Sequence, residues 1–194
     1  MSGVYCLDED MTDKKELTDN KLIALYLDRD DEAFEILYGR YKNAVYSFLN
    51  NLLPGQTALA DDLFQQAWMK VVKNLPKYKH ENNFLAWVLR IARNLSIDYF
   101  RKEGRRQTSS LDGFDTAGSA LDLPSSDMDS DELGQAIAAA VEKLPEDQRE
   151  VFALRQQNVS FKEIALIQET TLNTTLGRMH YAVNKLRTVL KEWL

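Results

Sequence analysis

The side chains that could do chemistry in this chain are mostly cations, amides and hydroxyls, and they form no catalytic set. The two histidines, His80 and His180, lie about a hundred residues apart, and Cys6 is the single cysteine. The sequence contains no G-x-x-x-x-G-K-[ST] phosphate loop, no H-E-x-x-H motif and no C-x-x-C motif. Its carboxylates form no recognisable acid–base pair or metal-ligand cluster. We therefore expect a binding protein without a metal or cofactor, and no enzyme.

One group of cations lies on a helix that the apolar residues of 84–99 predict. Arginines recur on the side opposite the apolar stripe, and the preceding loop adds more cations and an aromatic ring. Cations that follow phosphates, beside a ring that takes an unstacked base, would suit single-stranded DNA. The competing interpretation places Trp87 and Tyr99 in the core and leaves the arginines in water. The candidate contacts to a single strand are Lys77, Tyr78, Lys79, His80, Asn83, Trp87, Arg90, Arg93, Asn94 and Arg101.

A second candidate surface is the polar side of the helix predicted by ADDLFQQAWMKVV, residues 60–72. Leu63, Ala67 and Val71 form its apolar side. A compact polar face can dock a partner helix, although a face that contacts only solvent has the same pattern. The candidate residues for binding a protein partner are Asp61, Asp62, Gln65, Gln66 and Met69.

The C-terminal part predicts two helices separated by a tight turn. Ser160 and Glu163 have the spacing of a capping box, and Asn173 can cap the last helix, whose apolar stripe starts at Leu172 and Leu176. In a helix-turn-helix, the N-terminal residues of the second helix reach base edges in the major groove. An ordinary helical hairpin with a solvated arginine would show the same pattern. The candidate contacts to duplex DNA are Ser160, Lys162, Asn173, Thr174, Thr175, Arg178 and Tyr181.

The charge of the chain is unevenly distributed. The net charge is −6, yet residues 34–110 carry six acids and twelve bases. The flanking segments 1–33 and 111–134 are acidic. A basic block between two acidic ones suits a phosphate-binding surface with low non-specific affinity, although random surface variation would look similar.

We expect an all-α protein with two helical domains. Apolar residues recur at helical steps except in a stretch rich in Ser, Asp and Gly. This predicts a flexible acidic tail at 1–17, a four-helix domain at 18–106, a flexible acidic linker at 107–131 and a second helical domain at 132–194. The chain has no membrane-spanning apolar run and no secretory signal, and a lone cysteine suits a reducing compartment, so we expect a cytoplasmic protein.

Four segments together resemble the extracytoplasmic-function (ECF) sigma factors, alternative sigma factors of bacterial RNA polymerase. In the order typical of the family, they are ADDLFQQAW, FLAWVLRIARNLSIDYFRK, LPEDQREVFALR and SFKEIALIQETTLNTTLGRMHYAVNKLR. The resemblance implies that the first domain is the region-two domain, whose ADDLFQQAW helix binds the clamp helices of the largest subunit of core RNA polymerase. Its loop and basic helix would melt and read the minus-ten promoter element. The second domain would be the region-four helix-turn-helix domain, which reads the minus-thirty-five element and touches the polymerase flap.

The sequence departs from the family at several positions. Gln66 stands where relatives usually carry an acid, and Leu176 and Tyr181 occupy positions that are often basic. Fewer phosphate contacts predict weaker binding of the isolated protein to DNA. The resemblance also implies silencing by an anti-sigma factor as a partner, although no residue here identifies one. The alternative functions are a stand-alone helix-turn-helix transcriptional regulator and a helical protein-binding adaptor.

Overall fold

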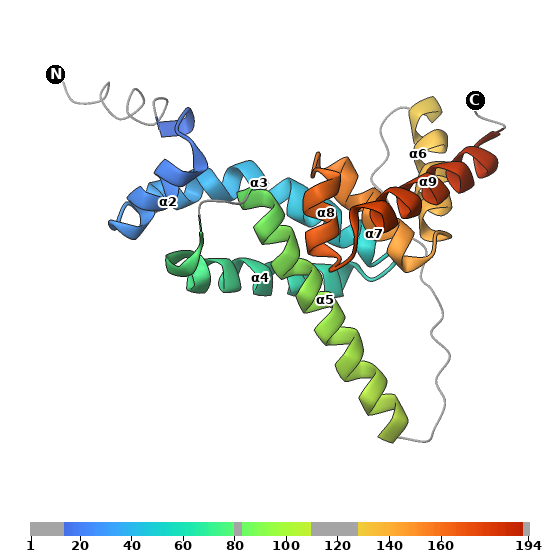
Figure 1. Cartoon of the computed structure of the whole chain (residues 1–194), viewed down its shortest axis with the longest axis horizontal. Helices are drawn as coiled ribbons and strands as arrows, with labels where there is room; N and C mark the ends of the chain where they lie inside the picture. Colours follow the sequence, from blue (N-terminus) through green and yellow to red (C-terminus); the bar gives the residue numbers. More distant parts are fainter. Residues whose placement is uncertain (1–13, 80–82, 110–127, 192–194) are drawn as a thin grey trace.

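The computed structural model describes residues 14–79, 83–109 and 128–191, which are helical and contain no strand. Most of the predicted tail and linker, together with His80, therefore lies outside the described residues. The predicted all-α fold is confirmed. The elements, in chain order (Figure 1), are α2 (Asp19–Leu27), α3 (Asp31–Leu52), α4 (Thr57–Asn74), the single 3-10 turn η1 (Leu75–Lys77), α5 (Phe84–Ser109), α6 (Met128–Glu142), α7 (Glu146–Gln156), α8 (Phe161–Ile167) and α9 (Leu172–Val189).

Helices α2 to α5 form the N-terminal half around one apolar core. Asp30 begins α3 as its N-cap, because its Oδ1 accepts a hydrogen bond from the amide of Ala33 at 3.4 Å. Leu37, Leu63 and Phe84, from three different helices, are buried together. Helix α3 contacts α2, α4 and α5, and α4 contacts α5. This packing leaves the outer sides of α4 and α5 available for other contacts.

Helices α8 and α9 form the turn that the C-terminal sequence predicts. Ser160 Oγ accepts from the amide of Glu163 at 3.3 Å, and Glu163 Oε2 accepts from the amide of Ser160 at 2.9 Å, which confirms the capping box. The N-cap of α9 is Thr171, whose Oγ1 accepts from the amide of Thr174 at 3.1 Å. The expectation that Asn173 caps this helix is wrong, because α9 begins one residue before it.

The buried side of α9 is rotated relative to its apolar stripe. Thr175 and Ala182 are fully buried, whereas Leu172 and Leu176 are exposed. Thr175 can enter the core because its hydroxyl donates to the carbonyl of Thr171 at 3.1 Å and leaves no unpaired polar atom. Thr175 was predicted to contact duplex DNA, but the structure buries its side chain.

Both ends of the predicted linker are helical. Helix α5 continues to Ser109 and α6 begins at Met128. The C-terminal part of α5 projects beyond the helices on which its first turns pack (Figure 1). Tyr99 lies in the second half of α5 and is 38% exposed, so the interpretation that placed it in the core is wrong.

The two halves of the molecule share one apolar core. Helix α7 packs on α3, and α8 packs on α5 (Figure 1). The buried residues Val151, Leu154 and Ile164 belong to the same cluster as the core of the N-terminal half. At the edge of this contact, Asn51 Nδ2 donates to Gln156 Oε1 at 3.2 Å. We call this packing of α7 and α8 on α3 and α5 the closed arrangement.

Replacing Ser160 with alanine should lower the free energy of unfolding by about 1 kcal/mol, because the first turn of α8 loses a hydrogen-bond acceptor. Urea unfolding followed by circular dichroism measures this loss. The exposed Thr188 in the last turns of α9 provides the control, and Thr188→Ala should change stability by less than about 0.5 kcal/mol. Equal losses in the two variants would contradict a stabilising role for the capping box.

Candidate nucleic-acid and protein interfaces

The outer side of α4 presents every residue predicted to bind a protein partner. Met69 is 72% exposed, which is unusual for a large apolar side chain on a helix that packs well on its other side. The hydroxyl of Tyr46 on α3 donates to Asp61 Oδ1 at 2.9 Å and ties this face to its neighbour. The exposed residues are Asp61, Asp62, Gln65, Gln66 and Met69.

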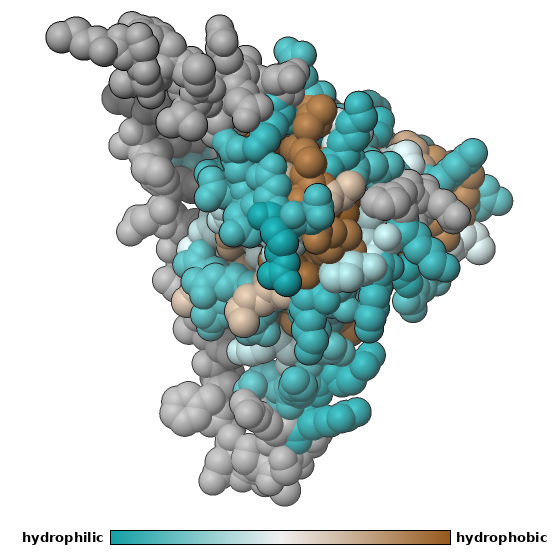
Figure 2. Space-filling view, turned by 90° about the vertical axis from the view of Figure 1, so that its left-hand side faces the viewer, coloured by the Kyte–Doolittle hydropathy of each residue, from teal (hydrophilic) through white to brown (hydrophobic). Residues whose placement is uncertain are grey.

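An apolar groove with a volume of about 710 Å³ lies beside this face, between α3 and α4. Trp68 is one of its lining residues and packs edge to face on Tyr38, with ring centroids 4.9 Å apart. On the face of the molecule nearest α2, hydrophobic side chains gather in a strip between hydrophilic ones (Figure 2). Sequence reasoning missed the groove, because helical spacing does not show which side of α3 lies next to α4. The lining residues are Phe34, Glu35, Tyr38, Phe64, Gln65, Trp68, Met69 and Val72.

Three aromatic rings hold the loop before α5 against the N-terminal half. The ring of the buried Tyr78 lies 4.9 Å from Trp87 and 5.6 Å from Phe84, measured between centroids. Burial raises the pKa of the Tyr78 hydroxyl. Trp87 is half-buried, so it packs in this cluster and still presents part of its ring to solvent.

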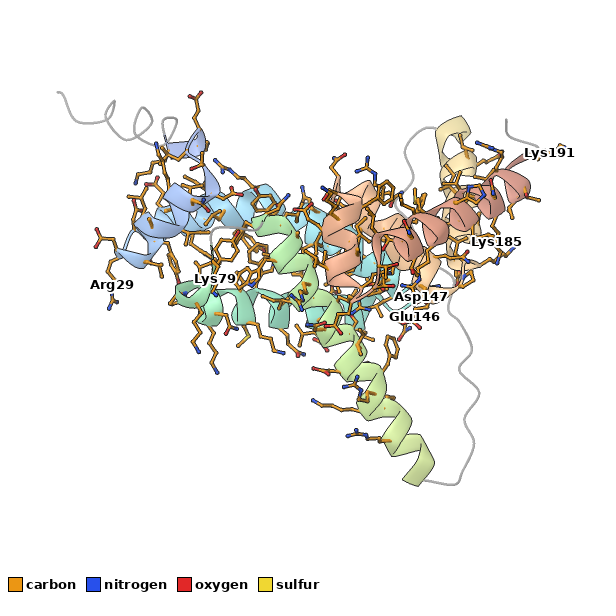
Figure 3. The ribbon with its side chains drawn as sticks, in the orientation of Figure 1. Arg29, Lys79, Glu146, Asp147, Lys185 and Lys191 are labelled. Carbon is orange, nitrogen blue, oxygen red and sulfur yellow. The ribbon has the colours of Figure 1, made fainter. Side chains whose placement is uncertain are left out.

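The other predicted loop contacts surround this ring cluster. Lys77 and Lys79 are exposed, and Lys79 marks the place of the loop in Figure 3. Asn83 is also exposed, and its Oδ1 accepts from the amide of Leu85 at 3.0 Å at the start of α5. His80 is not among the described residues, so its predicted contact has no structural counterpart here.

A polar cavity of about 380 Å³ opens beside the same loop. Tyr41 on α3 donates to Asp19 Oδ2 at 2.5 Å, and Arg40 donates to Asp19 Oδ1 at 2.8 Å. Burial and the bond to Asp19 raise the pKa of Tyr41, which keeps its phenol protonated and donating. Sequence reasoning missed this cavity because its walls come from separate segments. The lining residues are Thr18, Asp19, Asn20, Tyr41, Tyr78, Asn83 and Phe84.

The predicted DNA contacts of α5 lie in two environments. Asn94 and Arg101 are exposed, and Arg101 lies 3.7 Å from the carboxylate of Asp98 on its own helix. Arg90 and Arg93, by contrast, face acids of the C-terminal half. The closed arrangement therefore leaves the outer part of α5 open and covers its first turns.

The predicted contacts of the helix-turn-helix are also divided. Asn173 and Thr174 are exposed in the first turn of α9, and Tyr181 is 65% exposed further along it. Lys162 is exposed in the first turn of α8, where Ser160 serves as the N-cap. These residues are all exposed, whereas Thr175 is buried and the guanidinium of Arg178 is bound by other side chains.

Family models match both halves of the chain. Residues 37–106 match sigma-70 region 2, and residues 134–186 match sigma-70 region 4. The ECF RNA polymerase sigma-E factor of Escherichia coli (strain K12) is 30% identical over 177 residues, which cover 87% of this chain and 92% of that protein. The chain belongs to the extracytoplasmic-function family of alternative sigma factors. The sigma-E factor of Haemophilus influenzae is 27% identical over 87% of this chain and 93% of that protein.

Two solved structures are similar in fold to this chain. The sigma factor RpoE from Bartonella quintana, in a co-crystal with the anti-sigma factor NepR, matches with a TM-score of 0.70 and 27% identity, over 81% of this chain and 96% of that chain. CnrH, in complex with the cytosolic domain of CnrY, matches in fold with a TM-score of 0.64 and 23% identity, over 90% of this chain and 97% of that chain.

The described residues offer neither a membrane-spanning helix nor a metal-binding cluster. None of the helices there is long and apolar enough to cross a membrane. The same residues contain no group of three or more His, Cys, Asp or Glu side chains that could hold a metal ion.

A continuous series of hydrogen bonds links region 2 of this sigma factor to its recognition helix, α9. Arg93 on α5 donates to Oε1 of Glu150 on α7, and Gln168 Nε2 donates to Oε2 of the same carboxylate at 2.9 Å. Gln168 Oε1 accepts from Arg178 on α9 at 3.0 Å. Arg178 also donates to Asp147 at 2.6 Å, near the start of α7 (Figure 3). We call these five side chains the polar network.

Glu150 is the most buried member of the polar network, with a side chain only 5% exposed. Burial raises the pKa of its carboxyl group, and the Arg93 guanidinium and the Gln168 amide act in the opposite direction. A buried carboxylate is costly unless both oxygens are paired, and here Arg93 and Gln168 pair them. The only sequence signal for this site was an acid and an amide on otherwise apolar helix faces.

Replacing Arg93 with alanine should lower the free energy of unfolding by about 3 kcal/mol, because it leaves the carboxylate of Glu150 unpaired in the interior. Arg90 provides the matched control, since its contact with Glu169 is exposed and 3.6 Å long. Arg90→Ala should cost less than about 1 kcal/mol. Denaturant unfolding of both variants measures the difference, and similar losses would show that the Arg93–Glu150 pair is not the stronger contact.

Proposed function

We propose that this sigma factor binds core RNA polymerase through α4 and directs transcription initiation by reading two promoter elements, one with each half. The observation that best supports this is the match of both sigma regions, in order, over 92% of a curated sigma-E factor. The structure adds exposed surfaces of suitable chemistry in both halves. Promoter melting needs binding energy and no covalent step, so no catalytic group is required.

The polymerase partner of α4 is a helical surface with apolar and polar side chains, as the clamp helices of the largest subunit would provide. Met69 and Val72 offer exposed apolar contacts at the edge of the groove, and Asp62 and Gln65 lie on the polar face beside it. The neutral Gln66 gives this face one negative charge fewer than an acid would. That difference lowers the attraction to a basic partner and can alter the choice of polymerase contacts.

The minus-ten element is read by the loop before α5 and by α5 itself. Lys77, Lys79 and Arg101 are exposed cations that can follow the phosphates of a single strand. The polar cavity lined by Asp19 and Tyr41 offers hydrogen-bonding groups beside the ring of Tyr78, which suits one unstacked base. Extruding a base costs a few kcal/mol, which the phosphate and cavity contacts offset.

The minus-thirty-five element is read in duplex form by the start of α9. Asn173 and Thr174 are exposed at the end of the helix that a helix-turn-helix directs at base edges. Arg178 can donate two hydrogen bonds to a guanine once its guanidinium is free. Lys162, Ser160 and Tyr181 are exposed and are suited to the DNA backbone. The region-four domain also touches the polymerase flap.

The chain between the halves limits how far apart they can act. The described helices leave residues 110–127 between Ser109 and Met128, a length that spans at most roughly 60–65 Å when fully extended. Two turns of duplex measure about 70 Å. The projecting end of α5 and the length of α6 therefore contribute to the span between the two promoter elements.

A sigma factor of this family is also a target for an anti-sigma factor. The RpoE chain that this protein resembles at 27% identity was crystallised with the anti-sigma factor NepR. The groove between α3 and α4 is open in the closed arrangement, so a helical anti-sigma segment would compete there with polymerase.

Changing Asp62 and Gln65 together to alanine should abolish promoter-specific transcripts in a run-off assay with purified core polymerase and a pooled promoter library. The physical reason is the loss of the polar contacts that orient the clamp helices on α4. The control is the pair Glu142→Ala and Gln135→Ala, which removes exposed side chains of the same types from α6 and should leave transcript levels unchanged. Transcription that survives the α4 changes would refute this polymerase site.

Arg178→Ala should reduce transcription from promoters with an intact minus-thirty-five element by about tenfold or more, because a bidentate contact to a base contributes roughly 1–3 kcal/mol. It should also relax the preference at one base of that element. Arg187, exposed near the end of α9, is the matched control and should matter far less when changed to alanine. Run-off transcription on promoters with single-base changes tests this. Unchanged preference at every base would exclude Arg178 as a reader.

A further inference from the structure

Two leucines in the first turns of the recognition helix are exposed to solvent. Leu172 is 39% exposed and Leu176 is 42% exposed, although both belong to the apolar stripe of α9. The buried side of the helix passes through Thr175 and Ala182 instead. Because the two leucines are four residues apart, they lie on the same side of the helix, one turn from each other. We call them the leucine pair.

The leucine pair lies at the end of α9 that a helix-turn-helix directs at base edges. A single exposed leucine needs no explanation, because much of any protein surface is apolar. These two leucines, however, occupy the same turns as Asn173 and Thr174, which are exposed and are proposed contacts to duplex DNA. A helix that places Asn173 and Thr174 in the major groove therefore carries the leucine pair into it as well.

The start of α9 carries no charge in residues 172–177. The commonest specific contact to a guanine is made by an arginine or a lysine, and the next residue, Arg178, has its guanidinium bound to Asp147 and Gln168. Residues 172–177 offer one amide, two hydroxyls and the methyl groups of the leucine pair. In the major groove, the group that matches an apolar side chain is the C5-methyl group of thymine, which the other bases lack.

Gly177 follows the leucine pair and leaves the helix open beside it. A Cβ at this position would meet nothing within 4 Å beyond its own turn of helix, so packing inside the molecule does not require a glycine. Glycine within a helix is unfavourable relative to alanine. It does allow the backbone to approach a ligand closely, and contact between a leucine and a base methyl group needs such an approach.

We propose that Leu172 and Leu176 select thymines in the minus-thirty-five element by packing on their C5-methyl groups. This proposal rests on the proposed reading of that element by α9. It adds a source of specificity that needs neither a charge nor a hydrogen bond, and that follows from the burial of a methyl group away from water. The element should therefore contain a thymine, in one strand or the other, at each base pair that the leucine pair reaches.

Deoxyuridine tests this contact, because it differs from thymidine only in lacking the C5-methyl group. It forms the same base pair and presents the same O4 acceptor in the major groove. The element lies upstream of the transcribed sequence, so the replacement does not alter the transcript. Two templates of the promoter obtained by run-off selection, one with thymine and one with deoxyuridine, compete for the same holoenzyme in one run-off reaction. They differ in transcript length, and the ratio of the two transcripts measures the preference.

Each thymine of the element is replaced in turn, in both strands. The wild-type holoenzyme should prefer thymine about threefold to fivefold at one or more positions, because each methyl group is buried against a leucine. Leu172→Ala combined with Leu176→Ala should bring the ratio at those positions close to one. Val189→Ala is the matched control, since Val189 is an exposed apolar residue at the opposite end of α9, and it should keep the wild-type ratio.

A second variant separates the apolar contact from the shape of the helix. Leu172→Gln combined with Leu176→Gln keeps the length and the helix propensity of both side chains while making their ends polar. The thymine preference should again fall close to one, and the preferences at other base pairs of the element should remain. A thymine preference that survives both double variants would overturn the proposal. A loss of preference at every base pair in both would also overturn it, because the leucines would then only hold the helix in position.

Failure of this proposal and failure of the proposed function give different results. Promoter-specific transcription with no difference between thymine and deoxyuridine at any position would overturn the methyl contact and leave the sigma function standing. An equal fall in transcription from every template in the alanine variant, with an unchanged ratio, would mean that the leucine pair binds protein and not thymine. An absence of promoter-specific transcription would refute the proposed function and this proposal with it.

Discussion

Burying a carboxylate is costly unless its oxygens are paired, and in the closed arrangement of this sigma factor Glu150 meets that condition with a partner from the other half. Arg93 pairs one oxygen from region 2, and Gln168 pairs the other from the turn of the helix-turn-helix. Because Arg93 lies on α5 and Glu150 on α7, the pairing of this one carboxylate connects one half to the other. The surrounding apolar core supplies attraction without direction, while the hydrogen bonds specify which faces meet.

The same pairing explains how an acidic protein can be built to read DNA. The net charge is −6, and acids of the C-terminal half lie against the cations that DNA would otherwise attract. On the proposed function, binding DNA would exchange a carboxylate for a phosphate around the same guanidinium, so the net gain in free energy would be smaller than for a solvated arginine. On the same proposal, Glu150, Asp147 and Glu169 would reduce non-specific binding more than the same charges at distant positions, because screening weakens an exposed charge beyond about 8–10 Å.

The sequence predicted the features that depend on local physics. Helical periodicity and the capping box of Ser160 follow from short-range spacing, and the exposed face of α4 follows from the placement of its polar residues. The groove and the polar cavity could not be predicted, because their walls come from helices that are distant in the chain. The sequence did not predict the burial of Thr175. Its hydroxyl donates a hydrogen bond to the backbone of its own helix, so the side chain can be buried like a small apolar one, although threonine is a polar residue.

The interface between the halves was the hardest feature to predict, for a physical reason. A helix face buried against another domain has the same period as one buried within its own domain, so Val151 and Leu154 look like ordinary core residues. A buried ionisable side chain on that helix face distinguishes it from a face buried within its own domain. An acid inside a core requires a partner, and the residues near it in the sequence do not provide one. Glu150 is such a residue, and its partner lies 57 positions away in the chain. A charged residue within an apolar helical stripe therefore indicates a contact between distant segments, as the pairing of Glu150 with Arg93 shows.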